Sequence, residues 1–293
     1  MIIECEQLCH TYGEMDVLHN ISFSVQKGGV FGLLGKNGAG KTTIINIIMG
    51  FLRPTAGFCR VLGEPGHALS PPTRSRIGLL HERFIQYDFM SIAELERYYA
   101  GFYPRWEREL FFDLVNRLQV PYERTLGRLS CGQRSQVVLG LIVAQRPDLM
   151  ILDDYSMGLD VGYRRLFVEY LGEYVQKYGT TILITSHIVQ ELDPIIDNLI
   201  ILDHGRVCIS GRKQAFMEEF QCFSFERSPS AERLEEGEML VRVEHVGGRT
   251  LVHGFITGAE LAGYLDAHGV SHETLRRLPM NFEDAFIGLT GKY

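Results

Sequence analysis

A glycine-rich segment followed by lysine and threonine carries the clearest chemistry in this sequence. The run Gly35-Lys36-Asn37-Gly38-Ala39-Gly40-Lys41-Thr42 fits the spacing GxxxxGK[ST]. Glycines let successive backbone N–H groups face phosphate oxygens, the lysine reaches the β and γ phosphates, and the threonine hydroxyl can bind Mg²⁺. The segment therefore predicts a nucleotide phosphate site. The residues expected to contact the nucleotide there are Gly35, Asn37, Gly38, Ala39, Gly40, Lys41, Thr42 and Thr43.

The flanking residues supply the structural context that this spacing requires. Apolar residues fill 30–34, which predicts a buried strand, and residues 42–49 have helical apolar spacing. A strand, a glycine-rich turn and a helix form the opening unit of a parallel α/β sheet, with the phosphates at the positive N-terminal end of the helix. This unit alone leaves GTPases, kinases and motor ATPases as possible classes.

Two further segments narrow the class. Asp153 closes the apolar run 149–152, where an ionised carboxylate is costly unless a cation or strong donors compensate it. Mg²⁺ held jointly with Thr42 would compensate it, although a structural, hydrogen-bonded aspartate is the alternative. Asp154 follows directly and could act as general base toward the γ phosphate. About twenty residues upstream stands the pentapeptide Leu129-Ser130-Cys131-Gly132-Gln133.

In this order and spacing, these segments resemble the signature motif LSGGQ and the Walker B strand of ATP-binding cassette (ABC) ATPases. The resemblance covers residues 1 to about 220 and implies ATP and Mg²⁺ as cofactors, with Thr42 and Asp153 at the metal. It implies adenine stacking by Tyr12, a Q-loop position at Glu82, a D-loop at Gly158-Leu159-Asp160, and γ-phosphate sensing by His187. Lys41, Asp154 and His187 are the catalytic residues it predicts. Packing of Tyr12 and a solvated loop acid at Glu82 are the alternatives.

The resemblance also implies that one chain is half of the working unit. Ser130, Gly132 and Gln133 of the signature would contact the γ phosphate held by another subunit, in a homodimer or a heterodimer. Two positions depart from the family pattern: Asp154 stands where glutamate is usual, and Cys131 where glycine is usual. The shorter carboxylate puts the hydrolysis rate in question, because an ångström of misplacement can cost about a hundredfold. A small thiol at 131 is expected to be tolerated.

Composition excludes several other classes. Twenty-nine Lys and Arg against 36 Asp and Glu give a formal charge of -7, which disfavours nucleic acid as a partner. The apolar runs are shorter than the roughly 20 residues that cross a bilayer, and the first residues do not resemble a secretory signal. The six cysteines form no CxxC pair, so we expect reduced thiols.

The predicted fold is α/β: a P-loop NTPase parallel sheet core, an N-terminal antiparallel β subdomain, a helical signature subdomain, and a small C-terminal α+β domain. Buried strands are expected at 149–152, 181–184 and 199–202, with a helix near 132–145 and an aromatic-rich helical region at about 85–146. We place the nucleotide-binding domain at 1–220 and an accessory domain at 222–293, with a hairpin around Gly247-Gly248 and helices near 259–268 and 282–289.

The chain end favours export. Residues 280–291 resemble the ending LEDVFLALTG of ATPase subunits from bacterial drug, antibiotic and lipid exporters. The predicted function is therefore the ATPase of an exporter, peripheral on the cytoplasmic face of the cell membrane beside transmembrane permease subunits. An ATP-binding regulatory subunit with weakened hydrolysis at Asp154 is the first alternative. A soluble ABC protein of translation or DNA repair is the second, although neither a second cassette nor a long coiled-coil insertion is visible.

Overall fold

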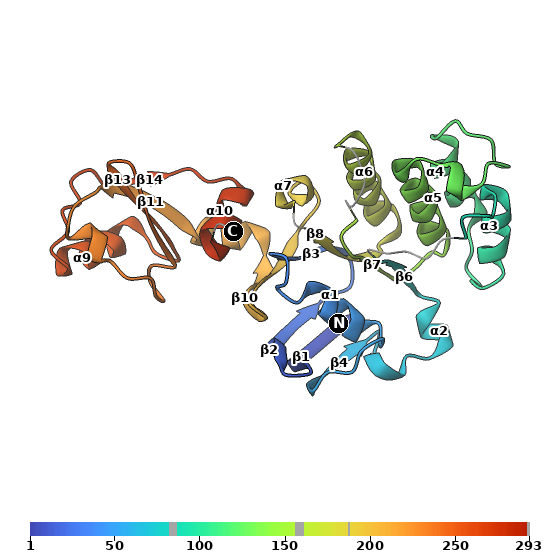
Figure 1. The fold of residues 1–293 in the computed structure, drawn as a ribbon, viewed down its shortest axis with the longest axis horizontal. Helices are drawn as coiled ribbons and strands as arrows, with labels where there is room; N and C mark the ends of the chain where they lie inside the picture. Colours follow the sequence, from blue (N-terminus) through green and yellow to red (C-terminus); the bar gives the residue numbers. More distant parts are fainter. Residues whose placement is uncertain (82–86, 156–160, 187, 292–293) are drawn as a thin grey trace. The chain divides into compact units, whose positions relative to one another are not determined.

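The computed structural model of this chain describes residues 1–81, 87–155, 161–186 and 188–291. These residues divide into two compact units, 1–210 and 211–293 (Figure 1). The division precedes helix α8 (Lys213–Glu219), which the sequence analysis assigned to the first domain. Among the described residues, no helix is long and apolar enough to cross a bilayer.

An antiparallel sheet opens the first unit, as the sequence predicts. Strands β1 (Ile3–Tyr12), β2 (Met15–Val25), β4 (Ala56–Val61) and β5 (Glu64–Pro65) are ordered β2-β1-β4-β5, and of these β4 and β5 were not predicted. Alternating side chains such as Ile3, Leu8 and Ile21 are fully buried. Cys5 and Cys59 are paired across β1 and β4 as buried free thiols, with sulfurs 3.6 Å apart.

The main sheet has six strands in the order β10-β9-β3-β8-β7-β6. Their bounds are β3 (Gly29–Gly35), β6 (Ile77–Leu80), β7 (Leu149–Leu152), β8 (Thr181–Ser186), β9 (Asn198–Asp203) and β10 (Arg206–Arg212). The β3–β8, β3–β9, β6–β7 and β7–β8 pairs are parallel. The predicted parallel α/β core is confirmed, while β6 and β10 were not predicted.

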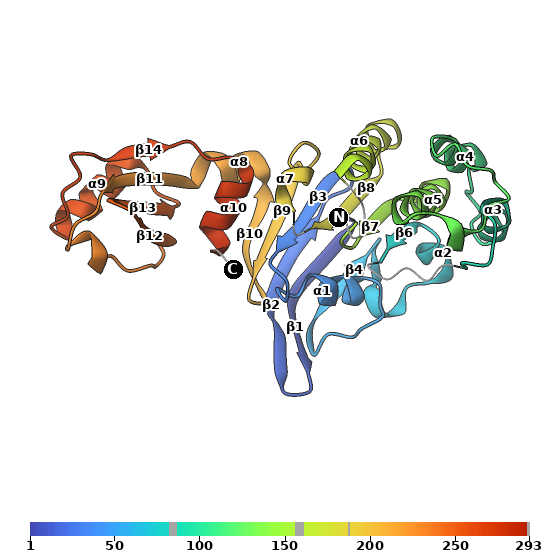
Figure 2. The same cartoon turned by 45° about the horizontal axis from the view of Figure 1, so that its top comes forward.

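Helices cover the sheets of the first unit. Helix α1 (Lys41–Ile48) lies between the N-terminal sheet and the main sheet, and its isoleucines join the core shared by both (Figure 2). Helix α6 (Val161–Tyr178) contacts β3 and α7 (Val189–Leu192), and the short helices α2 (Pro71–Arg74) and α7 connect strands. The order of strand, loop and α1 places the glycine-rich segment at the carboxyl end of β3, where parallel sheets bind ligands.

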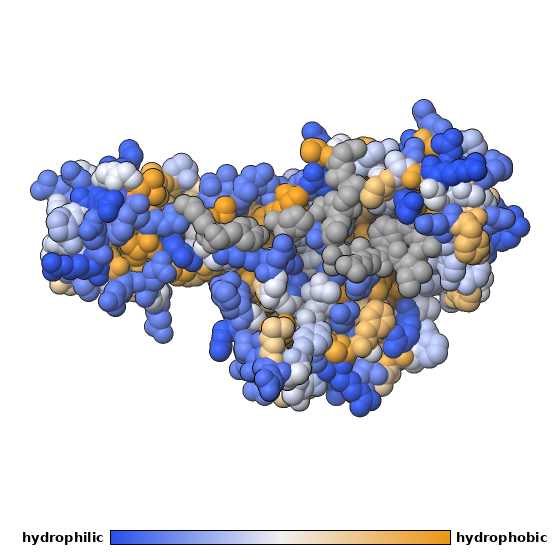
Figure 3. Space-filling view, viewed as in Figure 1, coloured by the Kyte–Doolittle hydropathy of each residue, from blue (hydrophilic) through white to orange (hydrophobic). Residues whose placement is uncertain are grey.

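The predicted helical region is a separate layer with its own core. Helices α3 (Ile92–Ala100), α4 (Arg108–Asn116) and α5 (Cys131–Ala144) pack around the fully buried Phe111. Four aromatic side chains of this region are exposed, most of all Phe89 and Phe102, whereas others such as Trp106 are partly buried against the core. On the face drawn in Figure 3, hydrophobic residues lie scattered among hydrophilic ones.

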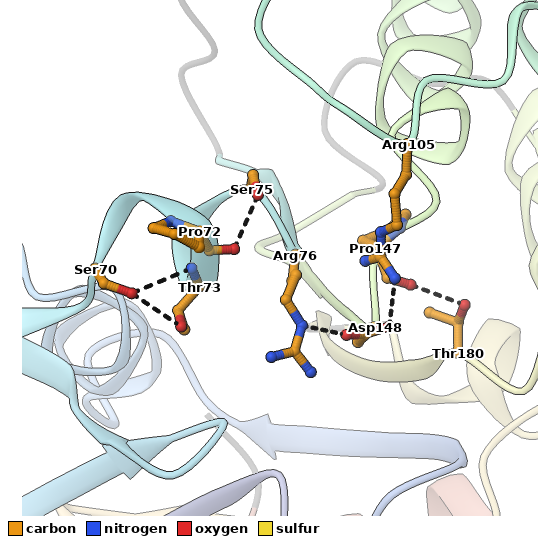
Figure 4. Close-up of polar contacts among 9 residues, drawn as sticks. All are labelled: Ser70, Pro72, Thr73, Ser75, Arg76, Arg105, Pro147, Asp148 and Thr180. Carbon is orange, nitrogen blue, oxygen red and sulfur yellow. Dashed lines mark hydrogen bonds and ion pairs between the residues drawn. The ribbon is translucent and has the colours of Figure 1, made fainter.

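An ionic cluster fixes the start of β7. Asp148 accepts hydrogen bonds from Arg76 Nε at 2.5 Å and from Arg105 Nη1 at 3.1 Å, and Thr180 donates to the neighbouring Pro147 carbonyl at 3.0 Å (Figure 4). Burial acts to raise the pKa of Asp148, but the two guanidinium groups hold that pKa below its ordinary value. The cluster joins β6, β7 and the helical region at the base of the strand that ends in Asp153.

Replacing this carboxylate tests the cluster. Asp148→Asn is expected to lower the free energy of unfolding at pH 7 by about 1 kcal/mol, because an amide loses the charge that pairs with both arginines. Since the native pKa is depressed, the stabilisation is present above the ordinary aspartate pKa and is lost as pH falls through the native pKa. Urea unfolding at pH 7 and at about pH 3 should show the difference between the two proteins narrowing in acid.

The exposed pair Asp113–Arg117, 3.9 Å apart, provides the control, and Asp113→Asn should change stability little. An equal stability loss for Asp148→Asn at both pH values would contradict the ionic explanation.

The second unit is a small α+β fold. Strands β11 (Gln221–Glu226), β12 (Arg242–Val246), β13 (Arg249–Gly254) and β14 (Arg276–Leu278) are ordered β12-β13-β11-β14, with helices α9 (Gly258–Ala267) and α10 (Phe282–Thr290). The β12–β13 hairpin and both helices agree with the sequence analysis, which predicted neither β11 nor β14. Phe225, Val252 and Leu261 form part of its own buried core.

Candidate nucleotide-binding site

A cavity of about 640 Å³ lies in the first unit, where the glycine-rich loop, the N-terminal sheet and the ends of β7 and β8 meet. Its lining brings together most of the residues predicted from sequence. These are Tyr12, Asn37, Gly38, Gly40, Lys41, Thr42, Thr43, Asp153 and Asp154. The volume suits a small-molecule ligand of nucleotide size.

Helix α1 presents an N-terminus prepared for an anion. Its N-cap is Gly40, which has no side chain to accept the first N–H groups, and its first turn has no acidic residue. The φ of Gly40 is 99°, a left-handed conformation that favours glycine, and a Cβ there would lie 2.6 Å from Leu18 Cδ2. The N–H groups and the helix dipole thus remain available for phosphate oxygens.

The Lys41 ammonium group lies inside the loop. Its Nζ donates to the carbonyl oxygens of Gly35 at 2.7 Å and Lys36 at 2.9 Å. Burial lowers the pKa of Lys41, and the charges of Asp154 and Asp153 oppose that shift. One cation and two carboxylates therefore share this end of the cavity.

The two aspartates differ in their surroundings. Asp153 at the end of β7 is 2% exposed, and its Oδ1 accepts a hydrogen bond from Thr185 Oγ1 at 2.9 Å. Asp154 is less buried and has a φ of 45°, and its backbone N–H donates to the same Thr185 oxygen at 2.8 Å. Left-handed backbone is more accessible to aspartate than to most residues that carry a side chain.

The residues present fit a magnesium ion bound with nucleotide phosphates. The Thr42 hydroxyl and the buried Asp153 carboxylate both line the cavity, and hard oxygen ligands of this kind suit Mg²⁺. In the described parts of the chain, no cluster of three or more His, Cys, Asp or Glu could hold a metal ion by itself. Mg²⁺ is usually bound through few protein groups together with substrate phosphates.

Tyr12 lines the cavity and is 45% exposed. The buried His10 ring packs edge-on against it, with ring centroids 4.6 Å apart. Sequence reasoning missed the neighbouring residues Met15, Asp16, Val17, His19, His204 and Gly205. The last two come from the β9–β10 turn, which is joined to β2 by a hydrogen bond from His19 N–H to the Gly205 carbonyl at 2.8 Å. No local pattern signals this long-range pairing.

The signature residues do not line this cavity. Ser130 is the N-cap of α5, where its Oγ accepts the Gln133 N–H at 3.3 Å and Gln133 Oε1 accepts the Ser130 N–H at 3.0 Å. A Cβ at Gly132 would lie 2.7 Å from the Tyr163 ring. Cys131 is the exposed first residue of α5, and its backbone does not require glycine.

Gly35 and Ala39 lie in the loop but are not among the residues lining the cavity. Glu82, the D-loop segment 158–160 and His187, all predicted to contribute to the site, fall outside the described residues.

Comparison with known proteins identifies the family. The family model described as ABC transporter matches residues 18–156, which include the glycine-rich loop and Asp153. A Nod factor export ATP-binding protein I from Sinorhizobium fredii is 32% identical over 99% of this chain and 86% of its own length. The chain belongs to the ABC transporter family. It is an ATPase subunit of that family, with the α/β fold and ATP-binding site that the family shares.

Other proteins similar to this ABC subunit support the same family assignment. The Nod factor export ATP-binding protein I of Burkholderia orbicola is 32% identical, covering 96% of this chain and 94% of the relative. A solved structure of an ATP-binding subunit of an ABC transporter is 26% identical with a TM-score of 0.68, covering 74% of this chain and 92% of that structure. A nucleotide-free ATP-binding cassette of an ABC transporter is 27% identical with a TM-score of 0.61, covering 72% and 91%.

Proposed function

We propose that this ABC subunit is the motor of an exporter: it binds ATP with Mg²⁺, dimerises on ATP, and hydrolyses ATP to move separate transmembrane permease subunits. The observation that carries the proposal is the cavity in which the α1 N-terminus, Lys41, Thr42, Asp153 and Asp154 converge. Export is supported by the resemblance of residues 280–291 to exporter subunits and by relatives named for Nod factor export. In this family, transmembrane subunits contact the exported substrate.

In this proposal each side chain has a chemical task. The α1 N-terminus and Lys41 bind and neutralise the phosphates, and Thr42 with Asp153 would hold the metal, which neutralises developing charge on the phosphates when bound. Asp154 would orient the attacking water and accept its proton. We also assign Gly35, Ala39 and Thr43 to the phosphate loop, and Glu82 and His187 to coupling and γ-phosphate sensing.

Assembly follows from the signature residues. Because Ser130, Gly132 and Gln133 lie away from the cavity of their own chain, we propose that they complete the site of a second subunit. Closure of two subunits over ATP would move the permease, and hydrolysis would allow reopening. The chain would then act at the cytoplasmic face of the membrane, bound to its permease partners.

Tyr12 is proposed to stack on the adenine ring. Tyr12→Ala is expected to raise the Kd for ATP about tenfold, because base stacking on an aromatic ring contributes on the order of 1–3 kcal/mol. Tyr12→Phe keeps the ring and should bind ATP as the native chain does. Fluorescent-nucleotide titration of the three proteins measures this, and equal affinities for Tyr12→Ala and the native chain would exclude the stacking role.

A regulatory subunit with weak hydrolysis is the second candidate, and Asp154 is the observation that favours it. The carboxylate is one methylene shorter than glutamate and stands on left-handed backbone. ATP trapping separates the two candidates: a motor releases phosphate during each cycle, whereas a regulatory subunit retains ATP in a stable dimer without phosphate release.

Co-purification tests the partner proposal. A tagged full-length chain, isolated in detergent from its native membranes, should bring down a multi-spanning membrane protein, and ATP with Asp154→Asn should trap a dimer by analytical ultracentrifugation. Recovery of the chain without any membrane protein, together with a monomer at saturating ATP, would contradict the proposed assembly.

A further inference from the structure

Thr185 lies two residues before His187 in the sequence and has no role in the site as described above. It lies on β8 next to the end of β7 and is fully buried. Its hydroxyl contacts both Asp153 and Asp154. Oγ1 is 2.8 Å from the Asp154 nitrogen and 2.9 Å from Asp153 Oδ1. One oxygen therefore joins the proposed metal ligand and the proposed general base.

The donors available on Asp154 and Thr185 determine the direction of both hydrogen bonds. The Asp154 backbone N–H can only donate, so the Thr185 oxygen accepts from it. A hydroxyl has a single proton, and this proton is directed to the Asp153 carboxylate, which accepts. Because that proton is committed, the hydroxyl fixes the rotation of the Asp153 carboxylate.

The same bond holds the turn at Asp154. The φ of 45° at Asp154 is a conformation that costs energy for a residue with a side chain. The hydrogen bond from its N–H to Thr185 secures this turn to the neighbouring strand. The backbone conformation of this turn sets the direction in which the Asp154 side chain points.

We infer that Thr185 is a positioning residue whose hydroxyl orients Asp153 toward the metal and Asp154 toward the γ phosphate. The inference rests on the proposed ATPase site and adds a residue to it. Groups that orient a metal ligand commonly change metal affinity or activity by about 10–100-fold when removed. A purely structural hydroxyl would instead change stability and leave the Mg²⁺ dependence intact.

The same strand offers a matched control. Thr181, at the other end of β8, is also fully buried, and its Oγ1 accepts the Gly28 N–H at 2.8 Å. Thr181→Val and Thr185→Val each remove one buried hydroxyl of the same strand, and both leave a backbone N–H without its acceptor. Of these two threonines, only Thr185 contacts Asp153 and Asp154. Both variants therefore lose a buried hydroxyl, but only Thr185→Val changes the contacts of the nucleotide site.

The experiment measures ATP affinity of the full chain as a function of Mg²⁺. In Thr185→Val, the Mg²⁺ concentration for half-maximal enhancement of ATP binding should rise about tenfold, while the Kd for ATP in excess EDTA stays within about twofold of native. Thr185→Ser keeps the hydroxyl and should restore the native Mg²⁺ dependence. Thr181→Val should match the native chain in both measurements.

Two outcomes would overturn the inference. Thr185→Val could show the same Mg²⁺ dependence of ATP binding as Thr181→Val, or Thr185→Ser could need as much Mg²⁺ as Thr185→Val. Thr185→Ser also keeps the test valid if Thr185→Val does not fold. Failure of the underlying function looks different, since it would appear as native ATP binding that Lys41→Ala does not weaken.

Discussion

Lys41→Ala is expected to reduce ATP turnover by at least about a hundredfold, because preorganised cationic contacts to a transferring phosphoryl group are worth that much. Lys41 is held inside the phosphate loop by the carbonyl oxygens of Gly35 and Lys36, which fix the position of its charge. The Kd for ATP should also rise, since the lysine neutralises phosphate charge in a cavity that three aspartates, Asp16, Asp153 and Asp154, line.

Phosphate-release assays measure the turnover, and ATP titration of the same preparations measures the Kd. Lys27→Ala removes an equal charge from an exposed position beyond the cavity and should behave as the native chain does. Lys41→Arg is expected to fail like Lys41→Ala, because a guanidinium fork does not fit the space of a compact ammonium group. Native turnover in Lys41→Ala would remove the phosphate loop from the mechanism.

Asp154→Asn is the second large effect. Asparagine keeps the size of the side chain, tolerates left-handed backbone, and retains the N–H bonded to Thr185. The change therefore removes the carboxylate alone. We expect turnover to fall about a hundredfold or more, as for loss of a general base, while ATP binding is retained or strengthened because negative charge near the phosphates is lost. Single-turnover phosphate release, with ATP affinity measured alongside, separates the two effects.

Asp154→Glu distinguishes the motor from the regulatory subunit. Glutamate extends the carboxylate by one methylene but fits left-handed backbone less well, so we expect a stability loss of about 1 kcal/mol. In a working motor, this variant should be no faster than the native chain. Near-background native turnover that Asp154→Glu raises would favour the regulatory subunit, and unchanged turnover in Asp154→Asn would exclude Asp154 as the base.

Sequence periodicity predicted the elements that place the site because their signals are local. The strand before Gly35, the helix after it, and the buried strand before Asp153 each follow from a short run of residue types. The parallel order of β7, β8 and β3 then brings the loop and Asp153 to one edge of the sheet.

The remaining features depend on contacts between distant segments. His204 and Gly205 line the cavity because the β9–β10 turn is hydrogen-bonded to β2. Thr185 contacts Asp153 because β7 and β8 are adjacent strands. The φ of Asp154 is likewise set by its turn and not by its residue type. Strand β6 is as short as β7, but a glycine interrupts its apolar side chains, whereas all four side chains of β7 are large and apolar.

ATP turnover by the purified complex of this chain with its membrane subunits tests the central claim most directly. We predict Mg²⁺-dependent phosphate release that saturates with ATP in the native complex and falls to background with Lys41→Ala or Asp154→Asn. Phosphate release that continues unchanged in both variants would show that the cavity around Lys41 and Asp154 does not perform the hydrolysis.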